Sequence, residues 1–506
     1  MDALLINPAS RARVYQALGT SLAAIENPVW AGLIASYLRA RGREVGIIDA
    51  EALSLDAEAV ARAVGDVRPS LAVVVVYGHQ PSASTQHMTG ASQIVKALKQ
   101  RHPEIPVLMV GGHVAALPER TLADEACDFV SVDDGLQTTA ALIDAVARRE
   151  TAAVLADAAS LRKVPGLAWR CDDRVEINGA APLIQDLDRE LPAMPWDLLP
   201  MHAYRAHNWH CFDAPDQRQP YAALYTSLGC PYHCSFCCIQ APFKRAESAA
   251  GLGDQVNSYR RWTAAAVLRE IDHLVSYFGV RNIKIADELF VLDPRHVRGI
   301  CDELIARDYQ LNMWAYARVD TIRDGMAARL KRAGVNWLAL GIEAADEGVL
   351  AGVDKRHSRA QVRDTVATLR AEGIRVIANF IFGLPDDTRD TMQATLDFAQ
   401  ELNREFANFY STMAYPGSAL FAQATREGWR LPDTWAGYSQ HAVDTLPLPT
   451  RHVSAGDVLA FRDRAFHQYF TAPAYLDMVT RTFGDAARTH VEQMTLHTLE
   501  RRYATR

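Results

Sequence analysis

The first 150 residues alternate short apolar, β-branched runs with longer stretches in which apolar side chains recur every three to four positions. The short runs predict strands, and the amphipathic stretches, such as Trp30–Arg41, predict helices. Leu71–Val76 is apolar throughout, as expected of a strand covered on both faces. This βαβ alternation predicts an α/β fold with a doubly wound, Rossmann-like sheet over residues 1–150. The expected strands are Ala3–Asn7, Glu44–Asp49, Leu71–Tyr77, Pro106–Gly111 and Asp128–Val132.

Residues 151–215 form an expected connector, because proline and turn residues punctuate them and the pattern supports one hairpin, Gly166–Ile177. A second alternation starts at Tyr221, and its six strand–helix repeats predict a partial (β/α)6 barrel over residues 216–425. The expected strands are 221–228, 281–286, 310–317, 335–342, 374–382 and 405–412, and the expected helices are 263–278, 294–307, 321–333, 359–372 and 388–402. Residues 426–506 are expected to be a small, mostly helical C-terminal region.

Composition narrows the class of protein. Of the 506 residues, 49% are hydrophobic and 22% are charged, which is typical of a globular protein. The net charge of −7 and the absence of any Lys/Arg run argue against a nucleic-acid or anionic-membrane partner. The N-terminus lacks the basic segment of a signal peptide, and no apolar run is long enough to span a bilayer. A cytoplasmic location without a membrane partner is therefore expected.

The cysteines point to one metal centre. Four of the eight lie within nine residues, in the segment Gly229-Cys230-Pro231-Tyr232-His233-Cys234-Ser235-Phe236-Cys237-Cys238, and the others are scattered singly. Thiolates spaced by four and three positions suit an iron–sulfur cluster in which each Cys binds one iron. Three ligands leave one iron of a [4Fe–4S] cubane open to a substrate. The alternative is a structural zinc site completed by His233 or Cys238. Cys238 is otherwise expected to be a core thiol.

The cysteine loop, with the aromatic Phe236 directly before its last cysteine, resembles that of the radical S-adenosylmethionine (SAM) superfamily. The following segments resemble the branch of that superfamily whose members carry an N-terminal cobalamin (B12)-binding domain. They are Ile285-Ala286-Asp287-Glu288-Leu289-Phe290, Tyr316-Ala317-Arg318-Val319-Asp320, Leu340-Gly341-Ile342-Glu343-Ala344, Phe382-Gly383-Leu384-Pro385 and Tyr415-Pro416-Gly417-Ser418.

This resemblance implies a [4Fe–4S] cluster on Cys230, Cys234 and Cys237, and SAM as a cofactor. It also implies roles for residues at the ends of successive barrel strands. Asp287 would hold the SAM amino group, Arg318 the SAM carboxylate, and Glu343 the ribose or amino-acid part, while Gly383 would let the adenine approach. The alternative for each charged residue is an ion pair inside the barrel mouth.

The N-terminal region resembles the cobalamin-binding domains of the same branch, through Leu4–Pro8, Pro28-Val29-Trp30, Gly111-Gly112-His113 and Leu117–Arg120. The candidate contacts implied for the corrinoid are Asn7, Ser82, Ser84, Gly111, Gly112 and Gly135. The Asp-x-His-x-x-Gly motif of many corrinoid proteins is absent, so no protein histidine is expected below the cobalamin. Asp133-Asp134-Gly135-Leu136 stands where the family commonly has Gly-Glu-Gly-Glu. A degenerate domain that only covers the barrel is the alternative.

Two further segments resemble functional sites without matching a motif. The segment 205–211 contains two histidines and a cysteine, but such spacing gives many false metal sites. His441, in the C-terminal region, is a candidate acid or base that is more commonly structural.

The leading hypothesis is a cobalamin-dependent radical SAM methyltransferase that acts on an unactivated centre of a small metabolite or natural-product intermediate. Its implied electron donor is an external protein of the flavodoxin or ferredoxin type. One alternative is a cobalamin-binding radical SAM cyclase or rearrangement enzyme without methyl transfer. Another is a non-catalytic iron–sulfur protein. No motif identifies the substrate, whose recognition is expected to lie in the connector and beyond residue 420.

Overall fold

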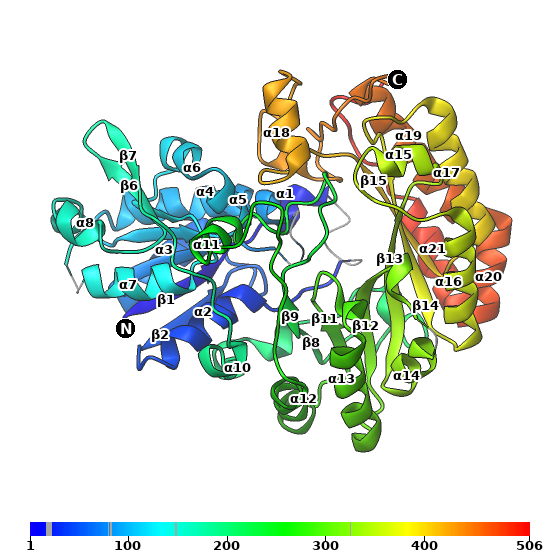
Figure 1. Ribbon diagram of the computed structural model, residues 1–506, viewed down its shortest axis with the longest axis horizontal. Coiled ribbons are helices and arrows are strands. Elements are labelled where there is room, and N and C mark those ends of the chain that lie inside the picture. The colour runs from blue at the N-terminus through cyan, green and yellow to red at the C-terminus, as the bar shows by residue number, and fades with distance from the viewer. Residues whose placement is uncertain (17–22, 79, 81–82, 147–148, 324, 506) are drawn as a thin grey trace.

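The computed structural model describes residues 1–16, 23–78, 80, 83–146, 149–323 and 325–505. It contains two large sheets (Figure 1). The first sheet, blue to cyan, lies on one side of the molecule and the second, green to yellow, on the other, with α18 (Ala419–Arg426) at the top of the view between them. The two predicted α/β units are therefore both present.

The first sheet has the strand order β2-β1-β3-β4-β5-β6-β7. Its first five strands are parallel, as the alternation of residues 1–150 predicts. Helices α2 and α7 pack on one face and α3 and α4 on the other, each pair over its own apolar cluster. The strands are β1 (Ala3–Asn7), β2 (Val45–Asp49), β3 (Leu71–Val75), β4 (Val107–Val110) and β5 (Phe129–Ser131); the helices are α2 (Val29–Arg39), α3 (Ala57–Val67), α4 (Ala83–Arg101) and α7 (Leu136–Val146).

The hairpin expected in the connector is present as β6 (Leu167–Cys171) and β7 (Arg174–Ile177). It does not stand alone, because β6 pairs antiparallel with β5 and so extends the first sheet. Trp169 of β6 is fully buried in this position. Short helices complete this half of the chain: α1 (Arg11–Val14), α5 (Gly112–Ala116), α6 (Pro118–Asp124), α8 (Thr151–Leu155), α9 (Ala158–Leu161) and α10 (Leu187–Glu190).

The second sheet is the expected (β/α)6 barrel, with six parallel strands that pair in their chain order. The strands are β8 (Tyr221–Leu224), β11 (Asn282–Ile285), β12 (Asn312–Arg318), β13 (Val335–Glu343), β14 (Arg375–Phe382) and β15 (Phe406–Ser411). The helices between them are α12 (Ala264–Phe278), α13 (Pro294–Arg307), α14 (Met326–Arg332), α16 (Arg359–Ala371) and α17 (Arg389–Leu402), with the shorter α11 (Lys244–Ala249) and α15 (Glu347–Ala351).

One expected strand, 221–228, is divided in two. Thr226 donates its backbone N–H to the carboxylate of Asp287 (2.5 Å) rather than to a neighbouring strand. The chain therefore leaves the barrel after β8, and β9 (Ser227–Leu228) pairs antiparallel with β10 (Arg260–Arg261). This break directs the cysteine loop away from the strand axis.

Aromatic side chains close the amino end of the barrel. The Trp209 ring, from the connector, lies 5.2 Å from Trp314, 5.5 Å from Trp337 and 6.0 Å from Phe406, measured between ring centroids. The C-terminal region contains the helices α19 (Ala455–Phe470), α20 (Pro473–Phe483) and α21 (Asp485–Thr495), whereas residues 427–454 before them are largely irregular. Helix α19 packs on β14 and β15 and covers that edge of the barrel. Within the described residues, no helix is both long enough and apolar enough to cross a bilayer.

Candidate functional site

The cysteine loop begins with a turn that requires glycine. Gly229 has φ +88°, and a Cβ there would lie 2.3 Å from the carbonyl oxygen of Ser258. Backbone hydrogen bonds then fix the middle of the loop, from Ser235 N–H to the Val353 carbonyl (3.1 Å) and from Leu420 N–H to the Ser235 carbonyl (2.8 Å). The loop is thus held between the segment after α15 and the first turn of α18.

Three thiols of this loop, Cys230, Cys234 and Cys237 (hereafter the loop cysteines), line one cavity of about 440 Å³. It extends inside the barrel from the cysteine loop to Trp209 and Trp314. All eight cysteines of the chain are free thiols. No three His, Cys, Asp or Glu side chains of the described residues converge as ligands of a single metal ion. A cubane requires no such convergence, because each thiolate binds a different iron. The donor set therefore fits a [4Fe–4S] cluster with one iron left for another ligand.

Desolvation raises the pKa of the Cys230 thiol, and the nearby Arg318 guanidinium offsets only part of this increase. The resulting pKa of Cys230 is about 11. Because only the thiolate binds iron, assembly of a cluster here releases protons. Cys238, the fourth cysteine of the segment, also borders the cavity but is buried, and its pKa is raised to about 12.

Arg318, at the end of β12, lies beside the loop cysteines. Its Nε and Nη2 donate to the two carboxylate oxygens of Asp320 at 2.9 and 3.0 Å. Its Nη1 donates to Cys234 Sγ at 3.6 Å, and the guanidinium carbon lies 3.8 Å from the centre of the Tyr232 ring. The sequence predicted a SAM carboxylate as the partner of Arg318; among the described residues, Asp320 and a loop cysteine occupy three of its nitrogens.

Glu343 ends β13 with φ +64° and faces the cavity. It accepts a hydrogen bond from Lys355 Nζ at 2.6 Å, and both side chains are at least nine-tenths buried. No sequence signal identified Lys355, because it lies in an irregular segment after α15 and in no recognised motif. Phe236, predicted from the loop spacing, also lines the cavity and packs against two small apolar clusters.

Two predicted SAM contacts do not border the cavity. Asp287 is fully buried and accepts hydrogen bonds from the Thr226 and Ser227 hydroxyls at 2.6 Å each. Burial raises its pKa to about 6. Gly383, at φ +80°, presents its backbone to α19, where a Cβ would meet Val458 at 2.5 Å. The neighbouring Glu288 does line the cavity, and burial raises its pKa to about 8.

A buried ion pair joins the two halves of the chain inside the barrel. Lys284 of β11 donates to Glu26 at 2.8 Å, with 1% and 6% of the two side chains exposed. The ammonium nitrogen lies 4.9 Å from the centre of the Trp314 ring and 5.8 Å from that of Tyr316. No sequence signal identified this pair, because its members are 258 positions apart.

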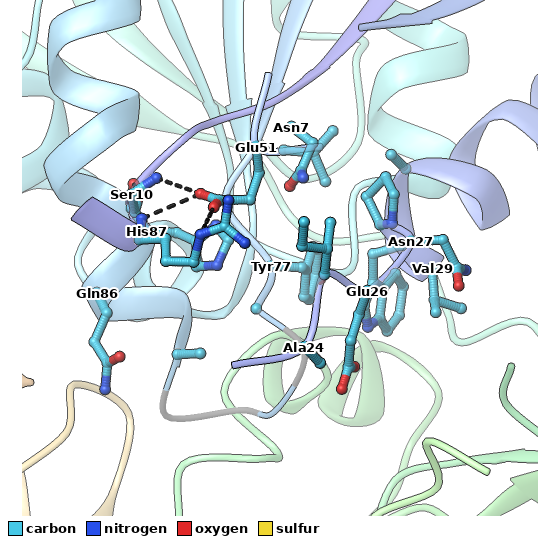
Figure 2. A pocket seen from close by; sticks show the side chains of 18 of the residues that line it. Asn7, Ser10, Ala24, Glu26, Asn27, Val29, Glu51, Tyr77, Gln86 and His87 are labelled. Atoms are coloured by element: carbon cyan, nitrogen blue, oxygen red, sulfur yellow. Dashed lines mark hydrogen bonds and ion pairs between the residues drawn. The ribbon is translucent and has the colours of Figure 1, made fainter. Parts of the chain in front are cut away.

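A second cavity, of about 80 Å³, lies at the carboxyl edge of the first sheet (Figure 2). Glu51 accepts hydrogen bonds there from the backbone N–H of Ser10 (2.7 Å) and of Arg11 (3.1 Å). Asn7, a predicted corrinoid contact, borders this cavity and donates to Asp49 at 2.8 Å. Four residues line both cavities, which therefore adjoin: Tyr15, Gln86, His207 and Ala286.

The other predicted corrinoid contacts gather at the ends of β3, β4 and β5. Ser84 Oγ accepts from the backbone N–H of His113 at 2.9 Å and lies near Gly112. Gly111, at φ +148°, passes so close to β3 that a Cβ would lie 2.2 Å from the Val76 carbonyl oxygen. Gly135 has φ +87°. Ser82 lies outside the described residues.

The aspartate pair before Gly135 is buried. Asp133 Oδ1 accepts from Ser131, Gly135 and Thr138 at 2.7 to 3.0 Å. Burial, with the adjacent Asp134 charge, raises the pKa of Asp133 to about 7. These contacts shape the last loop of the sheet and leave its carboxylates facing the protein.

The structure also places the segment 205–211 and His441, the two candidates that matched no motif. In the segment 205–211, His207 stacks on Trp209 with ring centroids 5.4 Å apart and lines both cavities, and the described part of the segment forms no metal-binding group. His441 lines the larger cavity and stacks on Tyr15 at 5.3 Å. Burial lowers its pKa well below the ordinary value.

Comparison with known proteins agrees with this arrangement. Residues 224–399 match the model of the radical SAM superfamily, and residues 15–143 match that of the B12 binding domain. An uncharacterized methyltransferase of Pyrococcus horikoshii is 26% identical over 94% of both chains. The anaerobic magnesium-protoporphyrin IX monomethyl ester cyclase of Rubrivivax gelatinosus is 27% identical over 81% of this chain and 68% of its own.

Solved structures share the fold of nearly the whole chain. The radical SAM methyltransferase TsrM of Kitasatospora setae, with cobalamin and a [4Fe–4S] cluster bound, has a TM-score of 0.65 at 16% identity, over 92% of this chain and 88% of its own. The cobalamin-dependent SAM radical enzyme OxsB has a TM-score of 0.67 at 16% identity, over 98% and 71%. The radical SAM domain implies a [4Fe–4S] cluster and SAM as cofactors of this chain, and the B12-binding domain implies cobalamin. The chain therefore carries a B12-binding domain at residues 15–143, followed by a radical SAM domain at residues 224–399.

Proposed function

We propose that this enzyme is a cobalamin-dependent methyltransferase that acts on a small molecule between its two cavities. The observation that carries the proposal is that the cavity of the loop cysteines adjoins the cavity at the carboxyl edge of the first sheet. When bound, the cluster and SAM supply a carbon-centred radical and cobalamin supplies the methyl group. A substrate at the junction would be within reach of both.

In this proposal the loop cysteines hold the cluster. Glu343, with Lys355 closing its other side, orients SAM at the cavity wall, and Phe236 packs beside it. Asp287 does not contact SAM in this proposal. It accepts hydrogen bonds from the Thr226 and Ser227 hydroxyls and so sets the direction in which the cysteine loop leaves the barrel. Gly383 contributes by letting α19 approach the end of β14.

The corrinoid contacts remain those predicted from the sequence, namely Asn7, Ser84, Gly111, Gly112 and Gly135. They support the proposal because they lie at the carboxyl edge of a parallel sheet, where such folds bind ligands. Gly112 leaves room there, since a Cβ at this position would have its nearest neighbour at 3.7 Å. Gly111 and Gly135 instead let Val76 and Val110 approach the turn closely.

The substrate site is proposed to lie around the four shared residues and the aromatic side chains Trp314, Tyr316 and Tyr410 of the larger cavity. These surfaces suit a small, partly apolar molecule. The electron donor is proposed to be a flavodoxin or ferredoxin, and the enzyme is proposed to act in the cytoplasm.

A second candidate function is cyclisation or rearrangement without methyl transfer, favoured by the similarity to the anaerobic cyclase. Methyl transfer is the better supported, because the relative that matches over 94% of both lengths is named a methyltransferase.

The test is anaerobic reconstitution of the full chain with iron, sulfide and hydroxocobalamin, followed by reduction with SAM present. Bound corrinoid is read from the visible spectrum and nucleoside products by mass spectrometry. Methyl transfer predicts bound corrinoid with both 5′-deoxyadenosine and S-adenosylhomocysteine. Deoxyadenosine alone would support the cyclase function, and absence of bound corrinoid would refute both.

A further inference from the structure

The guanidinium of Arg318 is held in one orientation by contacts on three sides. Two of its nitrogens bind both oxygens of Asp320, at 2.9 and 3.0 Å. The Tyr232 ring covers one face at 3.8 Å. These contacts direct the remaining nitrogen, Nη1, to Cys234 Sγ at 3.6 Å, within the range for a hydrogen bond to sulfur.

The surroundings of the two charges differ. The Arg318 side chain is 12% exposed, whereas that of Asp320 is 33% exposed. Water therefore screens the carboxylate more than the guanidinium. On the side of the loop cysteines, the arginine presents an N–H and an incompletely compensated positive charge.

We propose that Arg318 raises the reduction potential of the cluster by donating this hydrogen bond to the Cys234 sulfur. The inference rests on the proposed function, in which the loop cysteines hold the cluster. Hydrogen bonds to cluster sulfurs and nearby charges are the means by which a protein tunes such potentials. Asp320 and Tyr232 act as positioning residues, because they orient the guanidinium without touching the sulfur.

The step concerned is a single electron transfer. A reduced flavodoxin or ferredoxin loses one electron, the cluster gains it, and no bond is broken and no proton is moved. The cluster becomes more negative by one charge, part of which resides on its sulfurs. A positive N–H donor at Cys234 stabilises this reduced form more than the oxidised form, so the potential rises.

This role differs from pairing with the SAM carboxylate, the role expected from the sequence. A residue that contacts SAM affects the affinity for SAM but does not change the cluster potential when SAM is absent. A hydrogen bond to Cys234 affects the cluster whether or not SAM is bound. The two roles are therefore separated by measuring the potential of the SAM-free enzyme.

The experiment is an electron paramagnetic resonance (EPR)-monitored redox titration of the reconstituted full-length enzyme without SAM, with dithionite as the reductant. Arg318→Met removes the charge and the N–H while keeping a long side chain. Arg363→Met is the matched control, since Arg363 also binds a carboxylate through two nitrogens (Glu401, 2.6 and 3.0 Å) and faces an aromatic ring (Phe398, 5.3 Å), on the exposed surface of α16 and α17.

Arg318→Met is expected to lower the midpoint potential relative to wild type, and Arg363→Met to leave it unchanged. An unchanged potential in Arg318→Met, with weaker SAM binding, would overturn the inference in favour of the SAM role. If Arg318→Met assembles no cluster, the same titration of Asp320→Asn tests the inference instead. Asparagine keeps one acceptor oxygen that can hold the guanidinium but removes the negative charge, so the potential should rise. An unchanged or lower value would overturn the inference. Failure of the wild type to assemble a cluster would instead refute the proposed function.

Discussion

The buried pair of Lys284 and Glu26 provides a quantitative test of how the two halves of the enzyme are joined. The two charges meet at 2.8 Å with 1% and 6% of their side chains exposed, and the ammonium faces two aromatic rings. The perturbation is Lys284→Met, which keeps the length of the side chain and removes its charge. Glu26 then remains buried without its lysine.

The expected magnitude follows from burial. Removing one partner of a buried ion pair costs about 3–5 kcal/mol, because the other charge loses its counter-charge while it stays desolvated. Removing both charges, in Lys284→Met with Glu26→Gln, should cost much less, since neutral residues of similar volume often replace such pairs with little loss. The double variant should thus be more stable than Lys284→Met alone.

The assay is urea denaturation followed by tryptophan fluorescence, which is sensitive here because Trp314 lies beside Lys284. The exposed pair Arg363–Glu401, with 47% and 50% of its side chains exposed, is the control, and its loss should cost at most about 1 kcal/mol. A loss below about 1 kcal/mol for Lys284→Met, or additive losses in the double variant, would refute the reasoning.

Three further predictions concern other parts of the enzyme. Replacement of any loop cysteine by serine should abolish the cluster, whereas Cys238→Ser should keep it. Both outcomes are measured by iron and sulfide content, and loss of the cluster in Cys238→Ser would contradict the proposed ligand set. Gly111→Ala should lower stability by about 1–3 kcal/mol or more and weaken corrinoid binding, because φ +148° and ψ 167° lie in a glycine-only region. Thermal unfolding and spectral titration measure the two effects, with Gly179→Ala as the control, since a Cβ there meets nothing within 4 Å. Equal behaviour of the two variants would count against a constrained turn at Gly111. Burial raises the Asp133 pKa from an ordinary 3.8 to about 7, so between these pH values the folded state binds a proton that the unfolded state does not. The stability of the wild type should therefore fall as pH rises from about 4 to 7. Asp133→Asn should flatten this fall in denaturation curves measured over that range, and a retained slope would show that another group titrates.

The elements and the cysteine loop were predictable from sequence because both depend on local information. The 3.6- and 2-residue periodicities reflect which face of each segment is buried, so the strands of both sheets lie close to their expected positions. The proximity of the loop cysteines follows from their spacing, since thiols separated by four and three positions in one loop cannot be far apart. Their assignment as cluster ligands came from the resemblance to the radical SAM superfamily. The glycine turn before Cys230 belongs to the same local pattern.

Side-chain direction at the barrel mouth was not predictable. Asp287 and Glu288 are adjacent acids at the end of β11, and only Glu288 faces the cavity, because Asp287 is drawn to Thr226 and Ser227 across the break after β8. The partner of Arg318 was missed for a similar reason. Asp320 is only two positions away, yet the guanidinium reaches it and Cys234 together only once β12 and the loop have been brought side by side.

The sequence by itself determined the two α/β units and the grouping of the loop cysteines, because short-range periodicity and spacing suffice for both. Only the tertiary structure decided that the hairpin extends the first sheet, that Glu26 meets Lys284 within the barrel, and that the two cavities adjoin. Each of these depends on contacts between segments far apart in the chain. Such contacts are set by the summed burial of many apolar surfaces, which no single motif encodes.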